Sequence, residues 1–430
     1  FDGSDLFGVD KKYRYLPLYS VSGLWRISQE PFMANAKWID NLVVRASYGL
    51  QGNIDKNTSP YLLGNYRIEN ILPGGSEDMI DVSGAPNKKL RWEKTHSVNA
   101  GFDFAVLNQA INLSVDYYYR KGVDLIGTQM LPLETGFEML TVNWASMQNQ
   151  GVEVALSTRN IHTKNFMWTT NFNFAYNNNK ILKEALREDA LEPGREGYPV
   201  GALFALKTAG LDEEGYPMFE GKDGKAVSAM EFFKLQEWGF GATDLTARER
   251  RELYTYVGTA DCPYTGGFNN TFTYKAFELG VNFSFDFGGK VRSQPTYSIV
   301  DFDKGRNTNR DILNRWTPEN TETIFPVLLS QNERLDEYMW YSNQNEIYRN
   351  LDIWIRDLNY VRLQNIRLGY TLPTNFSRKL GMTSATIAIE GRNLLVFGSS
   401  YKNYLDPETM SNAYATPAPK SVTLSLNLNF

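Results

Sequence analysis

The sequence predicts an all-β protein, and specifically a transmembrane antiparallel β-barrel. Three observations predict this class. Apolar and polar residues alternate without a break along residues 422–430, and a period of two indicates a strand with one apolar and one polar face. About eleven such segments follow one another, each of roughly 9 to 15 residues. Short and long connections alternate between the segments, which is typical of outer-membrane barrels.

Composition excludes several other classes. The chain has 430 residues, of which 42% are hydrophobic, and no uninterrupted apolar run is long enough for a membrane-spanning helix. The formal net charge is −5, and no basic stretch with interleaved aromatic residues is present, so a nucleic-acid binder is not predicted. The single cysteine, Cys262, excludes a disulfide scaffold.

Each predicted strand shows the same two-residue period. In order, we expect strands near residues 17–26, 42–51, 97–104, 111–120, 151–157, 168–177, 268–274, 278–287, 355–372, 387–392 and 422–430. One of them changes phase, because Val361 and Leu363 share one parity whereas Ile366 and Leu368 share the other. A β-bulge near Gln364 would absorb that change.

The connections sort into two sets. Short links near 28–40, 107–110, 162–165, 275–277 and 373–383 alternate with long ones near 52–89, 127–141, 178–265, 289–352 and 398–418. If Phe430 ends at the periplasm, all short links become periplasmic turns and all long ones extracellular loops, as in bacterial barrels. A soluble β-sandwich, the alternative fold, gives no reason for this sorting. Within the long segment 178–265 we expect a hairpin near 202–219 and a helix-compatible piece near 229–252.

The strand count is odd, whereas closed single-chain bacterial barrels normally have an even number of strands. An open barrel would leave bare strand edges in lipid, which is not tolerated. The chain also begins with Phe1 and shows no signal peptide. We therefore expect this sequence to be the C-terminal part of a larger barrel, with an N-terminal portion missing.

Several short stretches resemble one family in the right order along the whole chain. They are Leu-Trp-Arg-Ile-Ser-Gln-Glu-Pro-Phe-Met at 24–33, Leu-Val-Val-Arg-Ala-Ser-Tyr-Gly at 42–49, Leu-Arg-Trp-Glu-Lys-Thr at 90–95, Asn-Gln-Gly-Val-Glu at 149–153, Tyr-Val-Arg-Leu-Gln-Asn-Ile-Arg-Leu-Gly-Tyr-Thr-Leu-Pro at 360–373, Gly-Arg-Asn-Leu at 391–394, and the terminal Phe430. Together they resemble the SusC/RagA-type TonB-dependent transporters of Bacteroidetes outer membranes.

The resemblance implies a 22-stranded barrel with an N-terminal plug inside it, of which this chain is the C-terminal half. It implies that the plug, the other barrel strands and the segment that engages the TonB complex lie upstream. It also implies a SusD-like surface lipoprotein as partner, and Phe430 as the signal read by the barrel-insertion machinery. The acidic, glycine-rich loop of many members is only loosely echoed by 212–215 and 222–224. The spacing Asp-x-Asp-x-Asp-Gly is absent there, so no calcium site is predicted.

Two sets of side chains are candidate functional residues. The polar faces of the strands should line the lumen through Arg45, Asp103, Asp116, Arg120, Glu153, Asp286, Glu390 and Arg392. Aromatic residues in the predicted outer segments should contact substrate, because sugar rings stack on aromatic faces and peptide side chains pack on them. These aromatic candidates are Trp144, Trp316, Trp340, Tyr341, Tyr401 and Tyr404; in any barrel, Trp and Tyr also serve as interfacial packing residues.

Catalysis is not predicted. The two histidines, His96 and His162, are not spaced as metal ligands, and Cys262 has no neighbouring histidine motif, so no metal, cofactor or nucleophile is expected. The sequence favours TonB-dependent import of an oligomeric nutrient, either an oligosaccharide or an oligopeptide. The alternative is a passive porin or a barrel-borne surface adhesin or binding protein.

Overall fold

The computed structural model describes residues 2–3, 15–55, 58–72, 75–82, 84–137, 139–186, 188–221, 223–236, 243–293, 305–307, 310–328, 349–398, 406–410 and 415–430. The chain divides into two compact units. The first comprises residues 1–187 and 194–200, and the second comprises residues 188–193 and 201–430. No helix in the described part of the chain is both long and apolar enough to cross a membrane.

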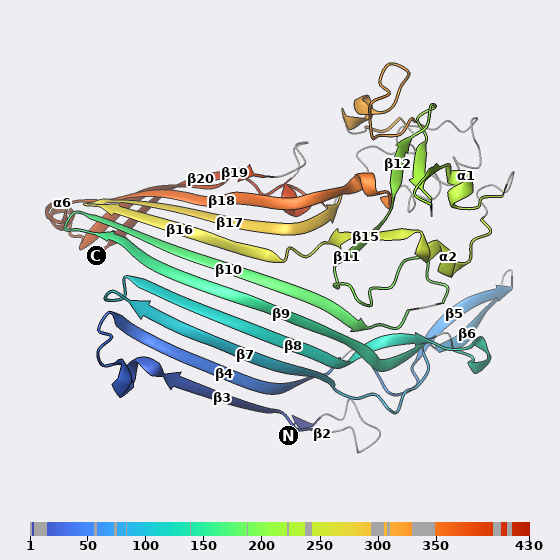
Figure 1. Ribbon diagram of the computed structural model, residues 1–430, viewed down its shortest axis with the longest axis horizontal. Helices are drawn as coiled ribbons and strands as arrows, with labels where there is room; N and C mark the ends of the chain where they lie inside the picture. Colours follow the sequence, from blue (N-terminus) through green and yellow to red (C-terminus); the bar gives the residue numbers. More distant parts are fainter. Residues whose placement is uncertain are drawn as a thin grey trace. The chain divides into compact units, whose positions relative to one another are not determined.

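The first unit is built on six long antiparallel strands, each paired with the next in chain order (Figure 1). They are β3 (Tyr19–Arg26), β4 (Ile39–Asn53), β7 (Glu93–Val106), β8 (Ile111–Met130), β9 (Met139–His162) and β10 (Phe166–Lys183). Between β3 and β4 lie two 3-10 turns, η2 (Ile27–Gln29) and η3 (Pro31–Met33), and η4 (Leu133–Thr135) joins β8 to β9. The short β1 (Asp2–Gly3) pairs with β2 (Tyr15–Leu16).

The second unit carries five long antiparallel strands, again paired in chain order. They are β16 (Tyr264–Tyr274), β17 (Phe277–Arg292), β18 (Ile355–Thr371), β19 (Ser384–Phe397) and β20 (Ser421–Asn429), with α6 (Thr374–Lys379) between β18 and β19. Among the described residues, the two units thus supply the eleven long strands that the sequence predicts, and the all-β class is confirmed.

The long strands present two chemically different faces. One face, called the apolar face below, carries residues such as Val44, Phe102 and Tyr117, which are exposed although they are apolar. In β20, Val422 and Leu424 are 68% and 76% exposed. Contiguous exposed apolar surface of this kind marks a membrane-facing or partner-facing side, and in a β-barrel it is the face turned to lipid. The opposite, polar face carries Arg45 and Asp116.

The phase change in β18 is a bulge at the predicted residue. Against β17, Leu363 pairs with Phe283 whereas Asn365 pairs with Asn282, so Gln364 is the extra residue. The register on the other side of the strand shifts at the same place. Gln364 Nε2 donates to Ser284 Oγ over 2.7 Å. The extra residue keeps apolar side chains on the apolar face both before and after it, as predicted.

One buried hydrophobic cluster of the second unit lies outside its long strands. Leu206, Phe219, Phe233, Leu351 and Trp354 pack together, and Phe219 and Trp354 are fully buried. Besides its long strands, the unit contains several small elements. They are β11 (Ala202–Leu206) paired with β15 (Tyr254–Thr259), a sheet of β12 (Thr208–Leu211), β13 (Pro217–Glu220) and β14 (Ala226–Val227), α1 (Ala229–Phe232), α2 (Ala247–Glu252) and the 3-10 turns η5 (Arg310–Asn314) and η7 (Asp352–Trp354).

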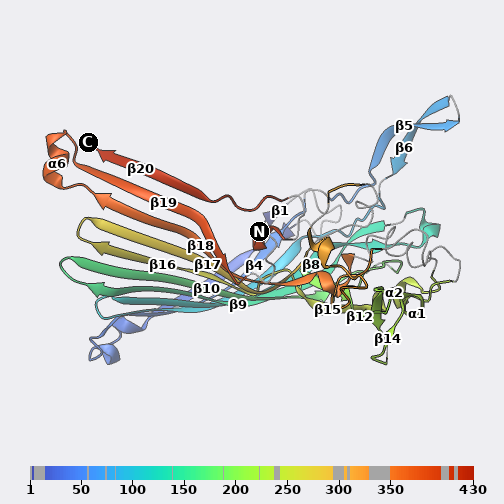
Figure 2. The same ribbon diagram turned by 90° about the horizontal axis from the view of Figure 1, so that it is seen from above.

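Several boundaries differ from those predicted. The strands β8 and β9 continue to Met130 and from Met139, so their connection is shorter than 127–141. The predicted loop 52–89 contains a hairpin of β5 (Gly64–Leu72) and β6 (Gly75–Val82), which Figure 2 shows projecting from the first unit. The strands β10 and β17 extend to Lys183 and Arg292, beyond the predicted loop starts at 178 and 289. Beyond the apolar band, apolar and polar residues no longer alternate regularly along the strands, so the two-residue period that reveals a strand disappears there. In the described residues of the helix-compatible piece 229–252, the structure has the two short helices α1 and α2.

Candidate functional site

The polar face of the first unit carries a network of charged side chains. Arg45 Nη2 lies 2.6 Å from Asp116 Oδ2 and 3.3 Å from Asp103 Oδ1. It also donates to Ser114 Oγ over 3.0 Å, and that hydroxyl donates to Asp103 over 2.7 Å. Three strands, β4, β7 and β8, therefore meet at one guanidinium group. Charge-assisted hydrogen bonds of this kind fix the side chains more firmly than neutral ones.

The strand register and one glycine explain how Arg45 reaches Asp116. Arg45 pairs with Gly101 of β7, and Gly101 pairs with Asp116 of β8, so the arginine must cross an entire strand. A Cβ atom at Gly101 would lie 2.2 Å from Asp116 Oδ1 and 2.8 Å from the carbonyl oxygen of Val115. The ion pair thus occupies the space above a residue without a side chain. Arg45 Nε is buried and has no hydrogen-bond partner within the described ranges.

A second glycine allows the same arrangement with neutral groups. Tyr118 of β8 pairs with Gly151 of β9, and Gly151 pairs with Asn177 of β10. The Tyr118 hydroxyl crosses over Gly151 and donates to Asn177 Oδ1 over 2.8 Å. A Cβ atom at Gly151 would lie 2.6 Å from that hydroxyl oxygen. Two residues further along the strands, Asn179 Nδ2 donates to Asn149 Oδ1 over 2.6 Å.

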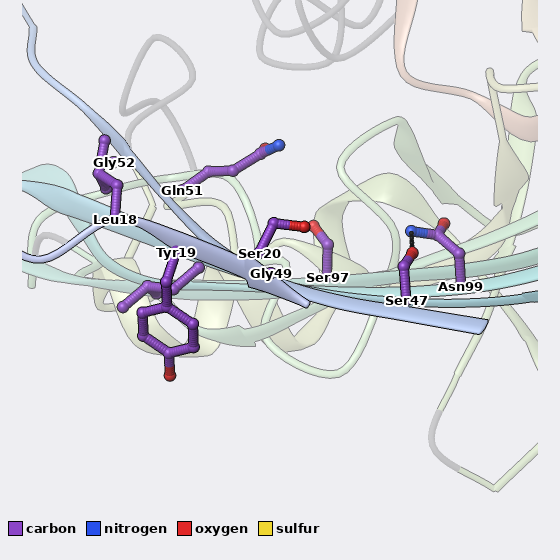
Figure 3. A pocket seen from close by; sticks show the side chains of 10 residues that line it. Leu18, Tyr19, Ser20, Ser47, Gly49, Gln51, Gly52, Ser97 and Asn99 are labelled. Atoms are coloured by element: carbon purple, nitrogen blue, oxygen red, sulfur yellow. Dashed lines mark hydrogen bonds between the residues drawn. The ribbon is translucent and has the colours of Figure 1, made fainter. Parts of the chain in front are cut away.

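Two cavities open on the polar face of β3, β4 and β7. The larger, of about 580 Å³, is lined by hydroxyl, amide and glycine groups together with Leu18 and Leu50, and by no charged side chain. Figure 3 shows Ser20, Ser47, Ser97 and Asn99 on one side of the strands and the ring of Tyr19 on the other. Asn99 donates to Ser47 over 3.3 Å. The smaller cavity, of about 350 Å³, borders the Arg45 network. The first unit therefore presents a neutral polar surface beside a charged one.

In the second unit, a buried arginine joins the wall to a loop. Arg362 of β18 forms ion pairs with Asp406 and Glu408, at 2.9 Å for Glu408. Glu408 belongs to η8 (Pro407–Thr409), which Asp406 caps by accepting from the Glu408 main-chain N–H. The Tyr360 hydroxyl also donates to Glu408, over 3.1 Å. Burial disfavours the charged Asp406 carboxylate, but hydrogen bonds from Arg362 and Glu408 outweigh it and lower the pKa of that carboxyl.

The other residues predicted to line the lumen are distributed along the sheets. Arg120 lies over the Tyr118 ring, 5.3 Å from its centroid. Glu153 stands opposite Asp116 in the register, and Asp286 stands opposite Tyr360. Glu390 and Arg392 of β19 form their own ion pair at 2.6 Å. The structure thus brings Arg45, Asp103 and Asp116 together, with Glu153 beside them. Sequence reasoning missed Ser114, Tyr118, Arg362 and Asp406.

The predicted substrate aromatics are only partly within the described residues. Trp144 has the ammonium group of Lys183 3.3 Å above its ring centroid. Trp316 packs on Gly215, where a Cβ atom would lie 2.5 Å from the indole Cδ2. Each ring therefore already contacts the protein on one side. Four candidates, Trp340, Tyr341, Tyr401 and Tyr404, lie outside the described residues. The ring of Phe430 is 84% exposed.

Nucleophilic and metal-binding groups are sparse in the described part of the chain. It contains no group of three or more His, Cys, Asp or Glu residues placed to hold a metal ion. Burial raises the pKa of the Cys262 thiol, and the Asp286 and Asp261 carboxylates raise it further. A thiol with a raised pKa is a poor nucleophile at neutral pH.

Known proteins share the sequence pattern and the fold of this chain. Residues 1–203 match the family model described as TonB dependent receptor-like, beta-barrel. The TonB-dependent receptor P3 of Formosa agariphila is 28% identical across 100% of this chain and 43% of the relative. The TonB-dependent receptor SusC of Bacteroides thetaiotaomicron is 25% identical across 100% of this chain and 41% of its own length.

Among solved structures, the RagAB peptide transporter contains a chain that superposes with a TM-score of 0.73 at 23% identity, over 99% of this chain and 44% of that one. The RagAB peptide importer in its "open-open" state gives 0.74 at 24% identity, over 99% and 44%. At this identity the likeness shows the fold. The chain spans less than half the length of the relatives it matches.

Proposed function

Because this chain carries the β-barrel domain of a TonB-dependent receptor and resembles SusC over its whole length, we propose that it forms wall and loops of an importer. The importer takes an oligomeric nutrient, an oligosaccharide or an oligopeptide, across the outer membrane. The observation that carries this proposal is the two-faced wall. Exposed apolar residues lie on one side, and on the other the Arg45 network lies beside a cavity without charged side chains. In a barrel, such a wall would turn its apolar face to lipid and its polar face to the path of a polar substrate.

The partners follow from the family and are part of the proposal. Energy comes from the TonB complex, and the rest of the full-length protein supplies the plug and the remaining barrel strands. A SusD-like surface lipoprotein acts with the importer at the cell surface. The relatives named above are receptors and transporters by name, and we propose no enzymatic activity for this chain.

Uptake measurements with the full-length protein test the proposal. Cells that depend on this protein should take up the nutrient only with an intact TonB complex and an inner-membrane proton gradient. A passive porin predicts uptake, and ion conductance in planar bilayers, that persist without TonB. An adhesin predicts surface binding without uptake. Mass spectrometry of oligomers that co-purify with the complex separates glycan from peptide substrates.

The orientation is proposed from the connections. The long segments 52–89, 127–141, 178–265, 289–352 and 398–418 lie outside the cell, and the short links face the periplasm. Cysteine labelling with a membrane-impermeant maleimide tests this. Glu69→Cys in the hairpin β5–β6 should react on intact cells, whereas Lys164→Cys in the β9–β10 turn should react only after lysis. The reverse pattern would invert the orientation without affecting the import proposal.

A further inference from the structure

The apolar face of the first unit is free of charge over five successive rows of paired residues. In strand order β4, β7, β8, β9 and β10, four of these rows are Leu42–Phe104–Leu113–Leu156–Phe172, Val44–Phe102–Val115–Val154–Phe174, Ala46–Ala100–Tyr117–Val152–Tyr176 and Tyr48–Val98–Tyr119–Gln150–Asn178. The row before these is Val106–Ile111–Thr158–Thr170, across β7 to β10. Tyrosines gather in the last two rows, as in the aromatic girdle of a barrel.

The next row on the same face is basic. It runs Leu50–His96–Lys121–Gln148–Lys180 across the same five strands. Lys121 and Lys180 are two strands apart in one row, which places their backbones about 10 Å from each other. Gln148 stands between them and accepts a hydrogen bond from the Tyr119 hydroxyl over 3.3 Å. The side chains of the apolar face thus change from uncharged to cationic one row beyond the tyrosines.

The height of this row coincides with one edge of the membrane. Lys121 follows Ile111 by ten positions on β8. At about 3.3 Å per residue this is about 33 Å along the strand. A strand tilt of roughly 35–45° projects it to about 25 Å, the height of the apolar band of an outer-membrane barrel. The side chains of the lysine row therefore lie where hydrocarbon gives way to lipid headgroups.

No acidic group neutralises this row within the described residues. Neither Lys121 nor Lys180 forms an ion pair there, and their cross-strand neighbours are His96 and Gln148. Asp124 follows Lys121 by three positions on β8, and its carboxylate is already held by Arg91 at 2.6 Å and Lys94 at 3.0 Å. Lysines that only extend toward water at a membrane edge need no anion. Here, two lysines stand on either side of the Gln148 amide in one row.

We propose that Lys121, Gln148 and Lys180 bind a phosphate group of an outer-leaflet glycolipid. The two ammonium groups supply the charge, and the amide between them supplies a further donor. The outer leaflet is assigned because the row lies on the side of the uncharged rows that is nearer to the long connections. This inference rests on the proposed orientation and does not depend on TonB-driven import, so its failure leaves the import proposal intact.

The experiment measures binding of defined glycolipids to the purified full-length protein in detergent. The probes are diphosphorylated lipid A, the same lipid A after enzymatic removal of its phosphates, and inorganic phosphate. Wild-type protein should bind the phosphorylated glycolipid and bind the dephosphorylated one far more weakly. Each lysine near an anionic headgroup contributes a factor of about five, so Lys121→Gln with Lys180→Gln should weaken binding about 25-fold.

A matched control removes two lysines from the opposite ends of the strands. Lys37→Gln with Lys164→Gln makes the same change of charge among residues of the short connections and should leave lipid affinity unchanged. An equal loss of lipid affinity in both double variants would overturn the site. Equal affinity of the wild-type protein for the phosphorylated and the dephosphorylated glycolipid would overturn it too. Saturation by inorganic phosphate at the same concentration would overturn the assignment to a lipid. The wild-type comparison of the two glycolipids stands even if a variant does not assemble.

Discussion

Arg362 and Asp406 form an ion pair between two side chains that are almost completely removed from solvent, 2% and 6% exposed, although 44 positions separate them in the sequence. One belongs to the wall strand β18 and the other begins η8. The pair therefore holds residues 406–410 against the polar face of the strand, with Pro407 and Met410 buried beside it. Burying a single charge here would be costly, whereas the pair is satisfied.

Arg362→Met should release this segment. The change leaves the buried Asp406 carboxylate without its cation, which costs roughly 3 kcal/mol or more. Hydrogen exchange of residues 406–410 in the full-length protein should rise accordingly, and adding Asp406→Leu should recover part of the loss. The matched control is Arg392→Met, which removes an arginine from the more exposed Glu390 pair and should cost at most about 1 kcal/mol. Equal exchange in both variants would refute the anchoring role.

The Arg362–Asp406 pair should also make this segment sensitive to acid. The pKa of Asp406 is lowered in the folded protein, so its contribution to stability is fully present above the unfolded value of about 3.9. That contribution is lost as the pH falls through the lower folded value. Protection of 406–410 should stay constant from about pH 7 to pH 5 and decline below about pH 4. In Asp406→Asn the decline in this range should be absent; an unchanged profile would assign the acid sensitivity to another group.

Gly101→Ala should disrupt the Arg45 network. The new Cβ would lie 2.2 Å from Asp116 Oδ1 and 2.8 Å from a main-chain oxygen, so either the ion pair or the strand must shift. We expect a loss of roughly 1–3 kcal/mol, seen as a lower temperature for the gel-mobility change that accompanies barrel unfolding. Gly23→Ala is the control, because nothing lies within 4 Å of its added Cβ. It should be neutral or slightly stabilising.

Deleting Phe430 should impair assembly more than stability. Its ring is 84% exposed, and the last hydrogen bonds of β20 are made by Asn429, to Thr383 and Ser384 at 2.7 Å each. Deletion keeps these bonds while removing the terminal aromatic group. The amount of protein in the outer membrane should fall sharply, and the fraction that does insert should unfold at the wild-type temperature. Phe430→Tyr should assemble normally. Normal assembly of the deletion would remove the predicted role of Phe430.

The faces of the strands were predictable because their signal is local. Alternation along residues 422–430 or 111–120 reports directly which side chains share a face, and the bulge at Gln364 follows from the same parity count. Arg45, Asp103 and Asp116 were assigned to the polar face on this ground. Their mutual contact was not predicted, because it depends on the register between strands and on the missing side chain of Gly101.

The contacts made by loops had no such signal. Asp406 lies in a segment without periodicity, and nothing in its neighbourhood marks it as the partner of Arg362. The cluster around Phe219 and Trp354 likewise joins segments more than a hundred positions apart. Trp144 is predicted to contact substrate, and its sequence neighbourhood does not show that Lys183 lies over one side of its ring through a contact between β9 and β10. These contacts between distant segments depend on the tertiary structure, and the local sequence around each residue carries no signal for them.

The bulge at Gln364 also bears on how sequences of this kind can be aligned. On either side of it, the same chemical face is carried by residues of opposite parity. An alignment drawn through β18 without a gap, against a relative that lacks the extra residue, would match positions of the apolar face with positions of the polar face over half the strand. The extra residue therefore leaves the two faces of the strand intact. In an ungapped alignment, however, it would make apolar and polar positions look exchanged. Comparisons of this wall should place their gaps at bulges rather than in turns.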